Sequence, residues 1–239
     1  GGWTFPLDAE ERFNFLLKNP ATDLYLIHEA EESFAQVVER CLAGKKKDIF
    51  ENPIPGSAFV KQNGPKPELV VGPEGTRMKE LDEIPSPFVM GLLDEFFDGN
   101  LFPVVETTRG CPFACNFCNS AEKYYSPVRR FSLDYVTKEL EYIGEKITKS
   151  GGGVLCIADT NFGMYSSDMA VSQKLAELKE EINWPQAIIL TTGKEKIDKV
   201  FETIEPLKDI LVPSMAAQSM DLDTLNAIDR TNLAEKTYK

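Results

Sequence analysis

The amino-acid sequence predicts an α/β fold in which buried parallel strands are joined by helical crossovers. From residue 101 onward, short apolar runs of strand length alternate with longer segments whose apolar residues recur at helical spacing. This alternation is typical of parallel strands, because each strand needs a crossover that carries the chain back to the start of the next. A barrel, a partial barrel and an open sheet all fit the pattern.

The composition indicates a globular chain without a nucleic-acid or membrane partner. The 239 residues are 42% hydrophobic, which is enough for a packed core. With 38 acidic and 26 basic residues the net charge is −12. A phosphate-backbone interface needs clustered Lys and Arg, so no nucleic-acid partner is expected. No apolar run approaches the ~20 residues that cross a bilayer.

The cysteine content favours a reducing compartment. The chain has 5 cysteines, an odd number, and three of them are crowded together. A secreted protein held by disulfides would show an even and more dispersed set. We therefore expect a cytoplasmic protein.

Residues 1–45 predict one α/β unit. A polar helical stretch is followed by a short buried strand at residues 23–27 and by an amphipathic helix at residues 32–42. The apolar face of that helix carries Phe34, Val37, Val38 and Cys41.

Residues 46–100 predict a connector. Seven prolines and four glycines lie between Asn52 and Pro87, and they interrupt any long periodic element. We expect a small hairpin around Gly64 and a domain boundary within this segment.

Four strands and three helices are expected in residues 101–239. The strands are residues 101–105, 154–158, 187–190 and 210–212. Ser132 is a good N-cap for the first helix, and the glycines at 151–153 read as a turn into the second strand. The apolar helix faces carry Val136, Leu140, Ile143 and Ile147, then Val171, Leu175, Leu178 and Ile182, then Ile197, Val200, Phe201 and Ile204.

Polar residues follow each of the four strands. They are Thr107 and Thr108, then Asp159, Thr160 and Asn161, then Thr191 and Thr192, then Gln218 and Ser219. In a parallel α/β barrel, the loops at the C-terminal ends of the strands build the active site. The loop after the first strand holds three cysteines, which are therefore expected at that end.

These cysteines stand in the run Thr-Thr-Arg-Gly-Cys-Pro-Phe-Ala-Cys-Asn-Phe-Cys and indicate a metal site. Cys111, Cys115 and Cys118 follow one another at spacings of four and three residues. Three thiolates can hold three irons of a cubane iron–sulfur cluster, which leaves one iron open to a ligand from outside the chain. An open iron is reactive, so the pattern favours an enzyme.

Two other interpretations of the three cysteines stay open. A structural zinc ion needs four ligands, but the one histidine, His28, lies in a different unit, and Cys41 and Cys156 are expected on core faces. A redox pair formed by the last two cysteines would leave the first unexplained. The alternative to an enzyme is thus a non-catalytic zinc or iron–sulfur binding module.

The arrangement Cys-x-x-x-Cys-x-aromatic-Cys, with Phe117 in the aromatic position, resembles the signature of the radical S-adenosylmethionine (SAM) superfamily. The resemblance implies a partial (βα)6 barrel, of which about four strands are present. It implies a [4Fe-4S] cluster on Cys111, Cys115 and Cys118, with SAM on the open iron. It further implies reductive cleavage of SAM to a 5′-deoxyadenosyl radical, with a reductant such as flavodoxin or ferredoxin as partner.

Two further segments resemble elements of the same superfamily. Residues 159–163 look like the Asp-x-Asn-Phe element that ends the second barrel strand, and residues 217–219 look like the fourth-strand element. The resemblance implies SAM contacts from Phe117, Asp159, Asn161, Thr192, Gln218, Ser219 and Arg230. From the residues alone, Asp159 and Asn161 could instead cap the following helix, and Arg230 could be a solvated helix residue.

The N-terminal part resembles the end of a Rossmann-like cobalamin-binding domain joined to a radical SAM domain. The resemblance rests on Gly1 and Gly2, on residues 23–34, and on the Leu-Asp-x-Ile-Pro-Ser-Pro run at 81–87. His28 and Ala30 stand where that subfamily commonly has glycine. The resemblance implies cobalamin in the full-length protein, and methyl transfer or a radical rearrangement on a small-molecule or peptide substrate.

The ends of the sequence indicate a fragment of a longer protein. The chain begins with glycine and stops within a segment that reads as helix. We expect the edge of the cobalamin domain at 1–45, the connector at 46–100 and the first part of the barrel at 101–239. No catalytic residue is assigned, because substrate contacts in this subfamily usually come from later strands.

Overall fold

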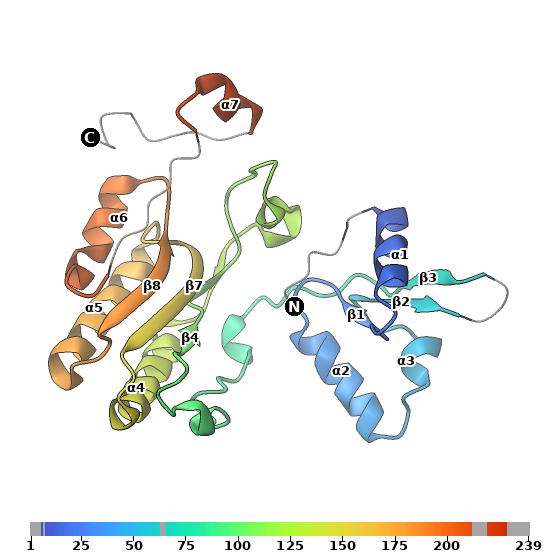
Figure 1. Cartoon of the computed structure of the whole chain (residues 1–239), viewed down its shortest axis with the longest axis horizontal. Helices are drawn as coiled ribbons and strands as arrows, with labels where there is room; N and C mark the ends of the chain where they lie inside the picture. Colours follow the sequence, from blue (N-terminus) through green and yellow to red (C-terminus); the bar gives the residue numbers. More distant parts are fainter. Residues whose placement is uncertain (1–5, 7, 63–65, 212–218, 229–239) are drawn as a thin grey trace. The chain divides into compact units, whose positions relative to one another are not determined.

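The computed structural model describes residues 6, 8–62, 66–211 and 219–228 (Figure 1). The chain divides into two compact units, Gly1–Lys79 and Glu80–Lys239. Each unit combines helices with β-sheet, so the predicted α/β class is confirmed. The domain limits expected at residues 45 and 100 remain predictions.

The first unit contains a three-stranded antiparallel sheet of order β1-β2-β3. Its elements are α1 (Ala9–Lys18), β1 (Tyr25–Leu26), α2 (Glu31–Leu42), α3 (Asp48–Glu51), β2 (Ser57–Lys61) and β3 (Glu68–Val71). Strands β2 and β3 pair from Ala58 opposite Val71 to Lys61 opposite Glu68, which confirms the predicted hairpin. Leu16 of α1 packs against Ala58 in the core of this unit.

The apolar face of α2 lies at the surface of the described structure. Phe34 is 59% exposed, Val38 is 39% exposed, and Cys41 is exposed as well. The expectation that Cys41 occupies a core face is therefore wrong. Helical spacing identifies an apolar stripe but not the element that covers it, and here α1 rather than α2 packs on β2 and β3.

The second unit contains a parallel sheet of order β4-β7-β8 (Figure 1). The strands are β4 (Val104–Val105), β7 (Val154–Phe162) and β8 (Ala187–Thr192). Val105 pairs with Ile157, and Ile157 pairs with Leu190. Leu211 forms an isolated parallel bridge with Ile188, at the place of the fourth predicted strand. The parallel strands joined by helical crossovers are thus confirmed.

The predicted helices form as α4 (Leu133–Ser150), α5 (Ser166–Ile182) and α6 (Ile197–Ile204), and a short α7 (Leu222–Ala227) follows. Ser132 caps α4, because its side chain accepts a hydrogen bond from the Tyr135 backbone N–H at 3.1 Å. The predicted apolar faces are buried, with three exceptions: Ile197 is half-buried, Ile182 is 38% exposed and Phe201 is 47% exposed. Ile182 ends its helix, and Phe201 lies beside the buried stripe through Val200.

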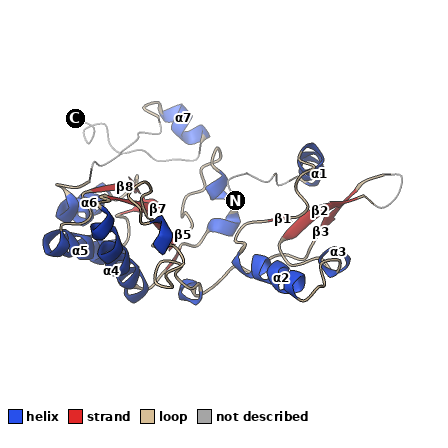
Figure 2. Cartoon of the chain, turned by 60° about the horizontal axis from the view of Figure 1, so that its bottom comes forward, coloured by secondary structure: helices blue, strands red, loops and turns tan. Residues whose placement is uncertain are grey.

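Helices cover one face of the parallel sheet. Figure 2 shows α4, α5 and α6 on the same side of the strands. Along β8, Ile188 and Leu190 are buried while Ile189 is 51% exposed, and on β4 Val105 is buried while Val104 is 51% exposed. Side chains of a strand alternate between its two faces. The second face, opposite the helices, is therefore the open one among the described residues.

A membrane-spanning helix is not found in the described part of the chain. None of its helices combines the length and the apolar character that crossing a bilayer needs.

Glu139 is an acidic residue buried on α4, with 5% of its surface exposed. Its carboxylate accepts hydrogen bonds from the hydroxyls of Ser86 and Tyr135. Burial nevertheless raises the pKa of Glu139 above the ordinary value of 4.5. The folded state then binds the proton of the Glu139 carboxyl group more tightly than the unfolded state does. Stability from this group is present below the unfolded pKa and is lost as the pH rises through the folded pKa.

We expect the unfolding free energy of the wild type to fall relative to that of Glu139→Gln as the pH rises above about 4.5. The size of this fall measures how far the pKa of Glu139 is raised, because one pKa unit corresponds to ~1.4 kcal/mol. Urea unfolding at a series of pH values measures it. Gln173→Ala, an exposed change on α5 that adds or removes no titratable group, is the control and should leave the pH dependence as in the wild type. Parallel curves for the wild type and Glu139→Gln would contradict the prediction.

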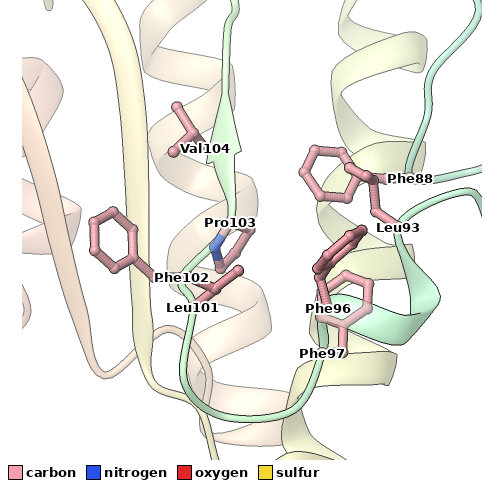
Figure 3. Close-up of a pocket in the computed structure, with 8 residues that line it drawn as sticks. All are labelled: Phe88, Leu93, Phe96, Phe97, Leu101, Phe102, Pro103 and Val104. Carbon is pink, nitrogen blue, oxygen red and sulfur yellow. The ribbon is translucent and has the colours of Figure 1, made fainter.

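An apolar cavity of about 250 Å³ lies beside the N-terminal end of β4 (Figure 3). Its lining comes from the segment before the strand and from the strand entry. These residues are Phe88, Leu93, Phe96, Phe97, Leu101, Phe102, Pro103 and Val104. All of these side chains are apolar, so the cavity offers no group for acid–base or metal chemistry.

Candidate functional site

A second cavity, of about 270 Å³, brings the cysteine loop next to the C-terminal ends of β7 and β8. Six predicted site residues line it together: Cys111, Cys115, Phe117, Cys118, Asp159 and Asn161. The cavity also includes Phe113, Ser120, Ala158, Thr160, Thr191 and Lys194, which the sequence did not single out as site residues.

The cysteine loop is closed at its base by a two-stranded hairpin of β5 (Thr108–Arg109) and β6 (Arg129–Arg130). Thr108 pairs with Arg130, and Arg109 pairs with Arg129. Inside the loop the Cys118 backbone N–H donates to the Cys115 carbonyl at 3.0 Å. The hairpin therefore fixes both ends of the segment that carries the three thiols.

The three cysteines differ in exposure. Cys115 is buried, Cys111 is half-buried and Cys118 is exposed. Phe117, between the last two, is 59% exposed. The loop thus contributes three thiols of different exposure to the cavity lining, and Cys115 is the most buried of them.

Asp159 anchors the segment that leads into the cysteine loop. It is 3% exposed, and one carboxylate oxygen accepts the backbone N–H groups of Thr107 at 2.8 Å and Thr108 at 3.1 Å. The other oxygen accepts the hydroxyl of Thr107. Burial raises the pKa of Asp159, although the hydrogen bonds from both threonines oppose that shift.

Thr160 and Asn161 continue this attachment toward Cys111. The Thr160 hydroxyl donates to the Gly110 carbonyl at 3.2 Å. The side-chain amide of Asn161 donates to the Thr160 hydroxyl oxygen at 2.9 Å and to the Cys111 sulfur at 3.4 Å. Three successive residues of β7 therefore hold the backbone and one thiol of the cysteine loop.

The part of β7 that carries these three residues pairs irregularly with β8. The pairing of β7 with β8 shifts register between Ile157 and Phe162. Burial still alternates along this stretch, because Asp159 and Asn161 are buried whereas Thr160 is exposed. Bulges of this kind redirect side chains and are common beside active sites.

The alternative in which Asp159 and Asn161 cap the following helix is wrong. Both residues lie within β7, and α5 is capped by Tyr165 and Asp168. One oxygen of Asp168 accepts the backbone N–H groups of Gly163 at 2.8 Å and Tyr165 at 3.1 Å.

At the end of β8 the cavity is lined by Thr191, whereas Thr192 is 1% exposed and is not part of the lining. Strand alternation explains the difference, because Thr192 shares the buried face of Ile188 and Leu190. The same alternation in the sequence could have distinguished the two threonines. Lys194 follows the strand and adds a cationic side chain to the lining.

The remaining predicted SAM contacts lie outside this cavity or outside the described residues. Ser219 is half-buried, and its hydroxyl accepts the Asp221 backbone N–H at 3.1 Å. Gln218 and Arg230 lie outside the described residues. Cys156 is half-buried on β7, opposite Val104 in the neighbouring strand.

The described residues hold no group of three or more His, Cys, Asp or Glu side chains arranged around a single metal ion. A cubane cluster asks for a different arrangement, because each cysteine binds a different iron. Three thiols that line one cavity without converging on a single point are compatible with that requirement.

The chain is homologous to curated methyltransferases, one of them named as a cobalamin-dependent radical SAM enzyme, and its fold is similar to that of two solved radical SAM enzymes. The resemblance seen in the sequence is thereby confirmed. Over 95% of its length, the chain is 28% identical to the cobalamin-dependent radical SAM methyltransferase TokK of Streptomyces tokunonensis. It is equally 28% identical, over 95% of its length, to the 2-(S-pantetheinyl)-carbapenam-3-carboxylate methyltransferase of Streptantibioticus cattleyicolor. The chain spans 33% of the length of each relative.

Two solved structures share the fold. The cobalamin-dependent SAM radical enzyme OxsB, with aqua-cobalamin and SAM bound, matches 90% of this chain and 30% of its own, with a TM-score of 0.60 at 17% identity. The radical SAM methyltransferase TsrM of Kitasatospora setae, with tryptophan and a SAM analogue bound, matches 94% of this chain and 43% of its own. Its TM-score is 0.62 at 12% identity. No protein-family model matches the chain.

Proposed function

We propose that this chain is the SAM-cleaving part of a cobalamin-dependent radical SAM methyltransferase. The observation that carries the proposal is the cavity in which Cys111, Cys115 and Cys118 meet the polar ends of β7 and β8. The curated relatives that match 95% of the chain are both named methyltransferases. A radical rearrangement is the other outcome that the same cleavage chemistry would permit.

The donor set of the cavity fits a [4Fe-4S] cluster. Cys111, Cys115 and Cys118 would hold it, and the cluster would supply the electron that cleaves SAM to methionine and a 5′-deoxyadenosyl radical. Three protein ligands leave one iron for SAM. The cavity is lined by sulfur, aromatic and hydroxyl groups, which suit a cluster on one side and a polar nucleoside on the other.

The residues of this chain have distinct tasks in the proposal. Asp159 holds the start of the cysteine loop through Thr107 and Thr108. Phe117 offers an exposed aromatic face beside the last cysteine, suited to the adenine of SAM. Contacts from Thr192, Gln218, Ser219 and Arg230 to the rest of SAM remain predictions from the resemblance.

The proposal includes a partial barrel. Strands β4, β7 and β8 neighbour one another in chain order, and the helices between them lie on one face of the sheet. A doubly wound open sheet would carry helices on both faces. The one-sided arrangement therefore favours the barrel over the open sheet that the sequence also permitted.

The proposal includes cobalamin as a cofactor because of a backbone feature in the first unit. His28 has a φ of 60°, in the left-handed region that favours glycine, at a position where the cobalamin subfamily commonly has glycine. This backbone supports reading residues 1–45 as the edge of a cobalamin-binding domain. We assign cobalamin to the full-length protein, with a small-molecule substrate and a flavodoxin- or ferredoxin-like reductant in the cytoplasm.

Anaerobic reconstitution of the full-length protein tests the proposal. We expect about four irons per chain and the release of 5′-deoxyadenosine when SAM and dithionite are added. A colourless protein with stoichiometric zinc would support the non-catalytic zinc module instead. A brown protein that releases no 5′-deoxyadenosine would indicate a non-catalytic iron–sulfur module.

A further inference from the structure

The side chain of Asn161 is aimed at the sulfur of Cys111. Its amide nitrogen lies 3.4 Å from that sulfur, and the residue is buried, with 7% of its surface exposed. The two residues are 50 positions apart in sequence, so the contact depends on how β7 sits beside the cysteine loop.

The orientation of the Asn161 amide follows from the hydrogen bonds around it. Thr160 has one hydroxyl proton, which it donates to the Gly110 carbonyl at 3.2 Å. Its oxygen can therefore only accept from Asn161, at 2.9 Å, so the NH₂ group and not the carbonyl oxygen of the amide faces Thr160. The second N–H of the same NH₂ group is then the one directed to the Cys111 sulfur.

We propose that Asn161 is a positioning residue that sets the reduction potential of the iron–sulfur cluster through its N–H···S hydrogen bond to Cys111. The proposal rests on the proposed function, since it needs a cluster on Cys111. It gives Asn161 a task different from the SAM contact that the sequence resemblance implies.

The direction of the effect follows from charge. One-electron reduction adds a negative charge to the cluster and its thiolates. A hydrogen bond to a thiolate sulfur stabilises the more negative state more strongly, so it raises the reduction potential. Asn161 would thus make the cluster easier to reduce by its electron donor.

The test is an equilibrium redox titration of the reconstituted full-length protein without SAM. The EPR signal of the reduced cluster measures the fraction reduced at each potential. For Asn161→Ala we expect the ratio of reduced to oxidised cluster at a fixed potential to fall about tenfold, a shift of about 59 mV for one electron. Asn161→Asp, which keeps the shape but replaces the donor with a carboxylate, should shift the potential further down. Asn161→Gln keeps an amide donor, so its potential should lie between that of Asn161→Ala and that of the wild type.

Thr148→Val is the control, because it removes an exposed hydroxyl group from α4, away from the residues that line the cavity. It should leave the potential at the wild-type value. If Asn161→Ala binds no iron, the reduction potential of Asn161→Asp is compared with that of the wild type instead. The inference is overturned if both variants keep the wild-type potential, or if both lose the cluster, which would make Asn161 a support of the loop only. A wild-type protein that binds no iron would instead contradict the proposed function.

Discussion

Replacing Cys115 by alanine is expected to abolish stable cluster binding and to lower 5′-deoxyadenosine formation by more than about 100-fold in the full-length protein. Loss of a residue that merely orients a metal ligand already costs about 10–100-fold, so loss of a ligand should cost more. Cys115 is the most buried of the three cysteines, at 9% exposure. Iron content per chain and product formation after anaerobic reconstitution measure the two effects.

The fold should survive this substitution. Cys115 lies in a loop that the β5–β6 hairpin closes, and the helices that pack on the sheet do not depend on it. Circular dichroism should therefore match the wild type. Cys156→Ala is the matched control, because it removes a half-buried thiol from β7 that the proposal does not use as a ligand. Full iron content in Cys115→Ala, or an equal loss in Cys156→Ala, would refute the ligand assignment.

Replacing Asp159 by alanine is expected to lower the free energy of unfolding by about 3–5 kcal/mol, since each buried donor left without a partner costs about 1–3 kcal/mol. The variant would leave the backbone N–H groups of Thr107 and Thr108 and the hydroxyl of Thr107 without the acceptor that Asp159 provides. Urea unfolding of the chain measures the loss. The reconstituted full-length variant should also bind less iron, because the segment before Cys111 loses its anchor.

Asp159→Asn separates the hydrogen bonds from the charge. Its amide oxygen can still accept both backbone N–H groups, and the Thr107 hydroxyl can rotate to accept from the new NH₂ group. We expect this variant to lie within about 1 kcal/mol of the wild type. If Asp159→Ala were as stable as Asp159→Asn, the carboxylate would not be the anchor of the loop.

Local sequence patterns were sufficient to predict most helices and strands of the second unit. The period of the apolar residues located α4, α5 and α6, and the Ser132 cap lies where it was expected. The same reasoning misplaced Cys41, since an apolar stripe on α2 carries no information about its covering partner. It also did not separate Thr191 from Thr192, although strand alternation puts them on opposite faces.

The sequence by itself determined the three cysteines at their spacing, the parallel α/β order and the class of enzyme that they resemble, because these features depend on neighbours a few residues apart. Only the tertiary structure decided what Asp159, Thr160 and Asn161 contact. Their partners lie 50 to 52 residues away in the sequence, where β7 runs beside the cysteine loop. Strand register and bulges depend on packing across the whole sheet, which a local pattern does not encode.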